Sequence, residues 1–116
     1  MPPTDSFAFR AFRALLDLHD SLMDAGMAEA GYHALTAAMH CAESSGDREQ
    51  LVVVMERAEL RQRQLDGKNP PHRLSSKQAE SRAHTPVFAS LALTANAVLV
   101  RLKADAVRAQ SAAKLR

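Results

Sequence analysis

Two pairs of residues have the types and the spacing that could bind a metal ion on one face of a helix. Glu29 precedes His33 by four residues, and Glu80 precedes His84 by the same interval. A carboxylate and an imidazole one helical turn apart can reach one ion. His40 follows His33 by seven residues, roughly 10 Å along a helix, which is too far to share that ion. The HxxxH and ExxH patterns of helical metal sites are absent. We therefore expect no metal and no other cofactor.

The residues that could act as nucleophile or base do not form a catalytic set. His19 lies beside Asp17 and Asp20 at the edge of an apolar stripe, and we expect a buried or half-buried histidine held by a hydrogen bond rather than a functional base. Cys41 has no CxxC partner, so we interpret it as a packing residue. A chain with four glycines has neither a GxSxG motif nor a glycine-rich phosphate loop. We expect no catalytic residues and a protein that is not an enzyme.

The length and composition favour one helical domain over residues 1–116. Alanine occupies 22 of the 116 positions, tryptophan is absent and aromatic residues make up 4%. Such a composition favours closely packed helices. A single cysteine excludes an internal disulfide and fits a reducing compartment. Asp5, Arg10 and Arg13 interrupt the N-terminus where a signal peptide would be apolar, so we expect a cytoplasmic protein.

Apolar residues recur at intervals of three and four residues, which predicts three amphipathic helices. The first follows an N-cap among residues 4–6 and ends at Gly26. Its predicted apolar face carries Ala11, Leu15, Leu18 and Leu22, with Phe12, Leu16 and Met23 beside it. The second runs from about Met27 to Ser44. Its predicted buried face carries Gly31, Leu35, Ala38, Met39 and Ala42.

The third predicted helix starts at a capping box formed by Asp47 and Gln50 and stops at residues 66–67. Its predicted buried residues are Leu51, Val54, Met55, Ala58 and Leu65. A proline-containing loop follows over residues 67–75, and Ser75 opens a short helical turn over residues 76–83.

Thr85 and Pro86 predict the start of a long apolar helix, with threonine as N-cap and proline at the first helical position. We expect this helix to fray after Ser111, which leaves residues 111–116 as a tail. The predicted fold is a small all-α domain of four helices: three amphipathic helices, the loop with its short helical turn, and the long C-terminal helix.

This last helix carries two apolar stripes on different faces. The first contains Phe88, Leu91, Ala95, Val98 and Leu102, and the three preceding helices can cover it. The second contains Leu93, Val100 and Val107, which either complete the intrachain core or form an interface between copies. Asn96, near that surface, either fixes the register of such an interface or is simply exposed. The uncharged run from Pro86 to Val100 has only 15 residues, so we expect no membrane span.

Residues 15–43, "LLDLHDSLMDAGMAEAGYHALTAAMHCAE", resemble a single tetratricopeptide repeat. The pattern is carried by Leu15, Leu18, Leu22, Gly31, Leu35 and Ala38. The segment departs from the family at His19, where a glycine is usual, and at Glu43, where a proline is usual. No second copy follows. The resemblance implies a helical scaffold for protein–protein contact without catalytic residues.

Charge is distributed unevenly along the chain. Residues 1–46 carry two basic and six acidic residues, whereas residues 86–116 carry five basic and one acidic. Such a chain can pair head to tail or present its basic end to an acidic partner, unless the charges merely solvate helix faces.

We predict a non-catalytic helical scaffold that forms a homo-oligomer, with a dimer favoured, through its last helix. The predicted interface residues are Leu93, Asn96, Val100 and Val107. The alternative is a nucleic-acid-associated protein, although acidic residues are interspersed among the basic ones and no stacking aromatic accompanies them. Its predicted phosphate contacts are Arg57, Arg61, Arg73, Lys77, Arg101 and Arg108.

Overall fold

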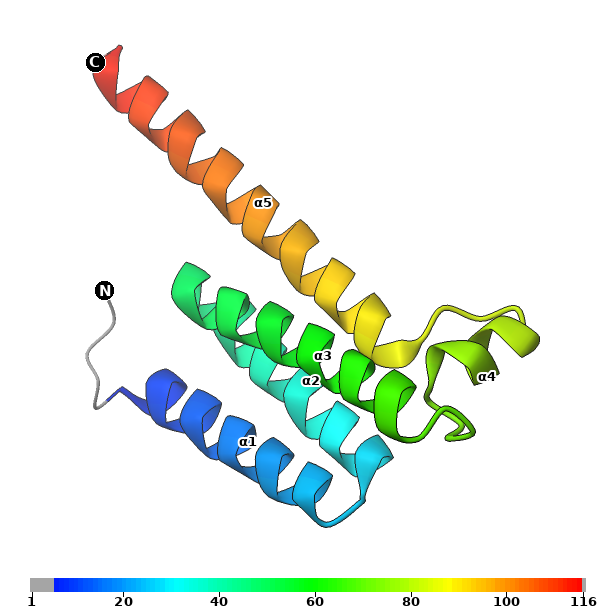
Figure 1. The fold of residues 1–116 in the computed structure, drawn as a ribbon. Helices are drawn as coiled ribbons and strands as arrows, with labels where there is room; N and C mark the ends of the chain where they lie inside the picture. The colour runs from blue at the N-terminus through cyan, green and yellow to red at the C-terminus, as the bar shows by residue number, and fades with distance from the viewer. Residues whose placement is uncertain (1–5, 116) are drawn as a thin grey trace.

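The computed structural model describes residues 6–115, which form helices joined by short connections (Figure 1). The helices are α1 (Phe7–Asp24), α2 (Ala28–Ser45), α3 (Arg48–Lys68), α4 (Ser76–Ser81) and α5 (Val87–Lys114). No strand occurs among the described residues. The predicted all-α domain of four main helices and one short helical segment is confirmed.

Local sequence explains where α1 and α3 begin and where α1 and α2 end. The hydroxyl of Ser6 accepts a hydrogen bond from the amide of Phe9 at 3.1 Å and caps α1. Gly26 and Gly46 end α1 and α2 with φ angles of 78° and 66°, a left-handed conformation that glycine adopts without steric cost. Asp47 caps α3 by accepting from the amide of Gln50 at 3.1 Å.

The predicted capping box at the start of α3 is only half formed. In a full box the N3 side chain bonds back to the N-cap amide. Here the amide of Asp47 instead donates to the carbonyl of Ala42 at 3.0 Å. Gln50 is buried, and its Oε1 atom has no hydrogen-bond partner within the described structure. The amide of Asp47, which would donate to the Gln50 side chain in a full capping box, therefore donates to the backbone turn after α2.

The start of α5 differs from the prediction. Pro86, not Thr85, occupies the N-cap position, with ψ at 135°, and the helix starts at Val87. No side chain of the N-cap residue caps this end. The amide of Ala89 instead donates to Oε1 of Gln62 on α3 at 3.3 Å. A tertiary contact thus replaces the local cap that the Thr-Pro pair predicted.

Two predicted boundaries are also wrong by a few residues. α3 continues to Lys68, so the connection expected at residues 67–75 begins only at Asn69. The amide of Asn69 still donates to the carbonyl of Leu65 at 2.9 Å. At the other end, α5 continues past Ser111 to Lys114. Residues 112–114 are two alanines and a lysine, which have high helix propensity.

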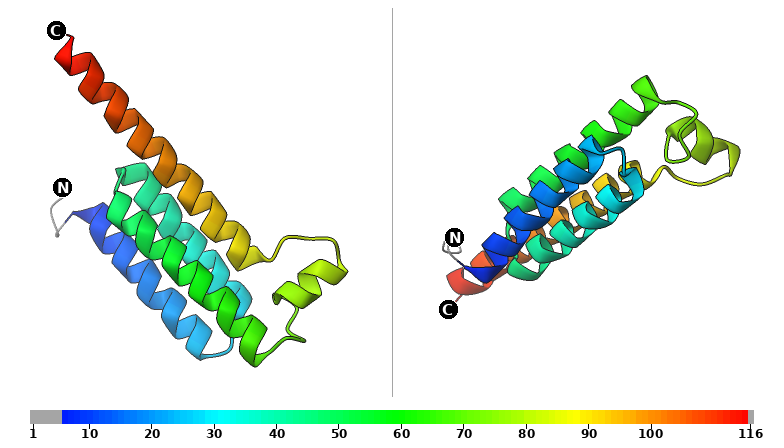
Figure 2. Two further views of the ribbon diagram at one scale, coloured as in Figure 1. Left: turned by 45° about the horizontal axis from the view of Figure 1, so that its top comes forward. Right: turned by 90° about the horizontal axis from the view of Figure 1, so that it is seen from below.

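The four long helices form a bundle with one overhanging helix. α1 and α2 form an antiparallel hairpin, α3 lies against α2, and α5 packs lengthwise and antiparallel along α3 while also touching α2 (Figures 1 and 2). The C-terminal part of α5 extends past the ends of the other helices (Figure 1). The longest dimension of the molecule is therefore 58 Å, against 17 Å for the shortest.

The first stripe of α5 is the centre of the core, as predicted. Phe88 is fully buried, Leu91, Ala95 and Val98 are buried beside it, and Leu102 is half-buried. The other helices and the α3–α4 connection contribute mainly small and aliphatic residues to this cluster. They are Phe12, Leu16, Ala28, Leu35, Ala38, Met39, Ala42, Leu51, Val54, Ala58 and Leu74.

The buried face of α1 is rotated from the predicted one. Leu18 is 50% exposed, whereas Phe12, Leu16 and His19 are buried. These three residues also follow the spacing of a helical face, one position along from the predicted stripe. Because both stripes are apolar, only the position of α2 and α3 decides which one is buried.

Candidate interaction surface

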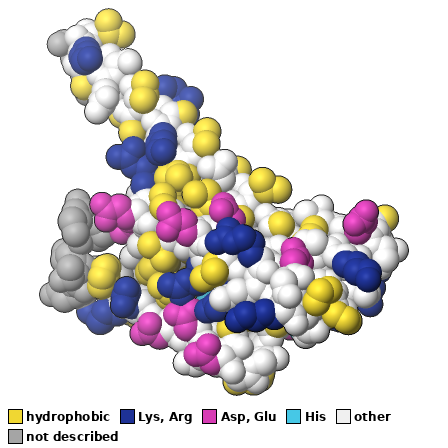
Figure 3. Space-filling model, viewed as in Figure 1, with side chains coloured by type: hydrophobic (Ala, Val, Ile, Leu, Met, Phe, Trp, Pro, Cys, Tyr) yellow, Lys and Arg dark blue, Asp and Glu magenta, His cyan; other side chains and the backbone are white. Residues whose placement is uncertain are grey.

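The second stripe of α5 lies on the outside of the bundle. Leu93, Val100 and Val107 are 67%, 57% and 61% exposed, and Asn96 is exposed as well. The sequence left open whether these residues complete the core, and the structure places them outside it. They share one side of α5, opposite the core face, because a spacing of seven residues is close to two helical turns. Hydrophobic side chains recur along the projecting part of α5 among lysines and arginines (Figure 3).

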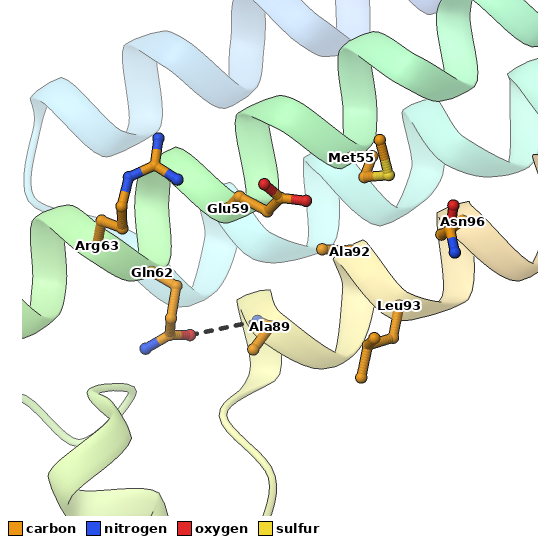
Figure 4. A pocket seen from close by; sticks show the side chains of 8 residues that line it. All are labelled: Met55, Glu59, Gln62, Arg63, Ala89, Ala92, Leu93 and Asn96. Atoms are coloured by element: carbon orange, nitrogen blue, oxygen red, sulfur yellow. Dashed lines mark hydrogen bonds between the residues drawn. The ribbon is translucent and has the colours of Figure 1, made fainter.

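A groove between α3 and α5 borders the N-terminal half of this stripe (Figure 4). It has a volume of about 600 Å³. From α3 it is lined by Met55, Glu59, Gln62 and Arg63, and from α5 by Ala89, Ala92, Leu93 and Asn96. Two predicted interface residues, Leu93 and Asn96, therefore border a concave surface together with α3, which the sequence did not indicate.

Gln62 joins three segments beneath this groove. Its Oε1 atom accepts from the amide of Ala89, and its Nε2 atom donates to the carbonyl of Leu74 at 3.1 Å and to Asp66 at 3.1 Å. Asp66 accepts in turn from the amide of Ser76 at 2.7 Å. Burial by itself would raise the pKa of Asp66, but these hydrogen bonds outweigh that effect and lower it. The network fixes the α3–α4 connection and the start of α5.

Sequence reasoning missed Gln62, although a signal was present. It follows Ala58 by four residues and continues the buried face of Leu51, Val54 and Ala58. A polar residue on a buried face must find hydrogen-bond partners. Met55 and Leu65, which we expected to be buried, are only half-buried.

His19 is fully buried where all four long helices meet. Its Nδ1 lies 2.7 Å from the carbonyl oxygen of Gly31, so this nitrogen carries the proton and donates. Its Nε2 then accepts from Nε of Arg61 at 3.1 Å. The ring also makes an edge contact with Phe88, at 6.2 Å between centroids. The predicted buried, hydrogen-bonded histidine is confirmed.

The surroundings of His19 lower its pKa from the ordinary value of 6.5. Burial is the largest cause, and together with the positive charges of Arg61 and Arg57 it outweighs the hydrogen bond to Gly31 and the charge of Asp20, which raise the pKa. Both ring nitrogens are occupied, so the imidazole has no free lone pair for base catalysis. Gly31 permits the close approach of α1 and α2 here, since a Cβ atom on it would stand 2.6 Å from Sδ of Met23.

Asp20, the neighbour of His19, joins α1 to α3. It forms ion pairs with Arg57 and with Arg61, the latter at 2.7 Å. Burial by itself would raise the pKa of Asp20, but hydrogen bonds from both guanidinium groups and their positive charges together lower it. Nη1 of Arg61 also donates a hydrogen bond to Oε1 of Gln64 at 3.0 Å. Arg57 and Arg61, two of the predicted phosphate contacts, therefore form ion pairs that join α3 to α1.

Three of the other predicted phosphate contacts also form ion pairs within the chain. Arg73 pairs with Glu29 on α2, Arg101 pairs with Glu43 at 2.9 Å, and Arg108 pairs with Asp105 one turn earlier. The arginine beside Glu43 lowers the pKa of that carboxyl. Lys77 lies exposed on α4. Five of the six predicted contacts thus have a carboxylate partner within the chain.

The residues that we considered for metal binding lie on the surface. Glu29, His33 and His40 are exposed on α2, and Glu80 and His84 are exposed around α4. No group of three or more histidine, cysteine or carboxylate side chains within residues 6–115 could hold an ion. Cys41 is a free, half-buried thiol packed against the core.

The composition of α5 bears on whether this helix could cross a membrane. The helix contains an 18-residue window with a mean hydropathy of 1.5, so by length and composition alone it is long and apolar enough to cross a membrane. A third of that window is buried within the bundle. Our count of 15 uncharged residues missed this window, because the window extends beyond the uncharged run. Insertion would require the face of Phe88, Leu91 and Ala95 to leave the core.

Comparison with known proteins gives no relative for this arrangement. No family model, no curated protein and no solved structure matches the chain.

Proposed function

We propose that this protein is a non-catalytic helical interaction module that forms a homo-oligomer, a dimer in its simplest form, through the exposed stripe of α5. One observation carries the proposal: Leu93, Val100 and Val107 are each more than half exposed and lie along one side of a helix whose opposite side is the core. An exposed row of large apolar side chains costs free energy in water, and contiguous patches of this kind mark interaction sites.

The pairing of the basic residues favours this proposal over nucleic-acid binding. A phosphate-binding surface needs unpaired lysine and arginine side chains on one face. Arg57 and Arg61 are half-buried against Asp20, and Arg101 binds Glu43 on α2. The predicted contacts would have to exchange these partners for phosphate. The apolar stripe, in contrast, is available without any rearrangement.

The solution mass of the full chain at low and high salt tests the proposal. We expect a species larger than the monomer by light scattering, with little change when salt is raised, because an apolar contact is hardly screened. A monomer at both salt concentrations would contradict the proposal. Binding to DNA or RNA that weakens steeply with salt would support the nucleic-acid alternative instead.

A pair of matched substitutions tests the surface itself. Val100→Glu places a charge in the middle of the stripe and should dissociate the oligomer while leaving the helix content unchanged. Thr94→Glu makes the same charge change at an exposed site of α5, about 120° around the helix from Val100. This control should keep the oligomer intact. Equal dissociation by both variants would show that the effect is not specific to the stripe.

A further inference from the structure

The three large residues of the α5 stripe are spaced symmetrically. Leu93 lies seven residues before Val100, and Val107 lies seven residues after it. When two such helices pair antiparallel about a two-fold axis at Val100, Leu93 of one chain meets Val107 of the partner subunit. All three side chains of each copy are then covered by an apolar side chain. This self-complementarity is what a two-fold interface requires.

The charge distribution of α5 distinguishes the two directions of pairing. Residues 87–100 carry no charged side chain, whereas residues 101–114 carry four basic residues and one acidic residue. A parallel pair would place the two basic halves side by side, and like charges at close range repel. An antiparallel pair places each basic half along the uncharged half of the partner. It also opposes the two helix dipoles.

The groove between α3 and α5 supplies the rest of the contact area between the two copies. A stable interface needs on the order of 20 residues on each side, which one helical stripe alone does not provide. In the antiparallel register, the C-terminal half of the partner's α5 runs beside Leu93 and Asn96, where α3 contributes Met55 and Glu59 to the groove. In this register the partner's Lys103 comes opposite Ala97, one residue from Asn96. Asn96 and Glu59 of α3 line the same groove, with Met55 between them (Figure 4). Glu59 is exposed, and the structure gives it no ion-pair partner among the described residues.

We propose that two copies of this chain pair through antiparallel α5 helices about an axis at Val100, with the overhanging half of each α5 covering the groove between α3 and α5 of the other. The proposal rests on the self-association proposed above and adds its geometry. It also gives a role to the length of α5, whose C-terminal half extends past its own bundle (Figure 2).

Cysteine crosslinking tests the direction of pairing. In a Cys41→Ser background, which removes the only native thiol, Leu93→Cys and Val107→Cys are prepared separately and also co-expressed, and all are then oxidised. The antiparallel dimer should crosslink only in the co-expressed sample, as a dimer with the combined mass of the two variants. Each variant alone should stay uncrosslinked.

The other outcomes of this experiment are distinguishable. If each variant crosslinks to itself, the helices are parallel, and the inference fails while self-association stands. A dimer by mass without a crosslink at either position places the interface elsewhere and also overturns the inference. If the protein is monomeric by light scattering, the proposed function itself is contradicted. Flotation of that monomer with neutral phosphatidylcholine vesicles would assign the stripe to a lipid surface.

A charge exchange tests the groove contact independently. Glu59→Lys and Lys103→Glu should each weaken the dimer by roughly fivefold at low salt, and the double variant should recover most of this loss. Within one chain the two residues are too far apart for this rescue, since Lys103 lies about 16 Å along α5 from Ala92, which lines the groove with Glu59. Additive weakening in the double variant would exclude this contact and with it the groove as the binding site.

Discussion

Gln62 on α3 accepts a hydrogen bond from the backbone amide of Ala89 and thereby caps the N-terminus of α5 from a different helix. The same side chain donates to the carbonyl of Leu74, so it joins the α3–α4 connection to the first turn of α5. This buried amide thus helps the core packing of Phe88 and Leu91 to place α5, and with it the groove and the exposed stripe.

Removing that amide should destabilise the fold. We expect Gln62→Ala to lower the free energy of unfolding by about 1–3 kcal/mol, because the amide of Ala89 and the carbonyl of Leu74 lose a partner in a buried setting. Urea unfolding at one fixed protein concentration measures this effect. Gln110→Ala, an exposed position of α5, should change it by less than about 0.5 kcal/mol. Equal losses would contradict a capping role.

His19 makes the stability depend on pH below neutrality. Burial lowers its pKa in the folded state from the ordinary value of 6.5, so the unfolded chain takes up a proton first as the pH falls. The contribution of His19 is therefore complete above pH 6.5 and declines as the pH falls toward the lowered pKa. The urea midpoint should drop over this range.

A matched pair of variants isolates this effect. His19→Gln should remove the decline just below pH 6.5, although it lowers stability at every pH. His84→Gln, which changes an exposed histidine, should retain the decline. A decline that persists in His19→Gln would assign the pH dependence to other groups.

The ion pairs of Asp20 predict a second, more acidic transition. Its pKa is lowered from the ordinary value of 3.8, so its contribution is present above that value and lost as the pH falls through the lowered pKa. At pH 7 we expect Asp20→Asn to cost about 1 kcal/mol, since Arg57 and Arg61 lose a half-exposed partner. Asp17→Asn, at an exposed position of the same helix, is the control for thermal melting. An equal fall in Tm for both variants would argue against these ion pairs.

Phe88 and Leu93 lie five residues apart on α5 and should respond oppositely to truncation. Phe88 is fully buried against Tyr32 and His19, with ring centroids 5.7 Å and 6.2 Å away. We expect Phe88→Ala to lower the free energy of unfolding by about 3–5 kcal/mol through the cavity it leaves. Leu93→Ala should leave the stability of the monomer nearly unchanged and weaken self-association. Light scattering and urea unfolding on the same samples separate the two effects.

The helical class and most of the helix boundaries could be predicted from the sequence. Ser6, Gly26, Gly46, Asp47 and Ser75 end or cap helices through bonds to residues no more than five positions away, and such bonds are set by local residue types. The core face of α5 could also be predicted, because Phe88, Leu91, Ala95, Val98 and Leu102 follow a helical period. The alternatives that stayed open concerned contacts between helices.

The contacts between helices could be learned only from the packed bundle. α1 carries two adjacent apolar stripes, and the position of its neighbours chose the one with Phe12 and Leu16 over the one with Leu18. The cap of α5 came from Gln62 rather than from Thr85. Arg57 and Arg61 bind Asp20 because the last turns of α1 lie close to the middle of α3. Periodicity defines the faces of a helix, but it does not specify which helix packs against each face. For the same reason only the packed bundle showed that Leu93, Val100 and Val107 remain exposed.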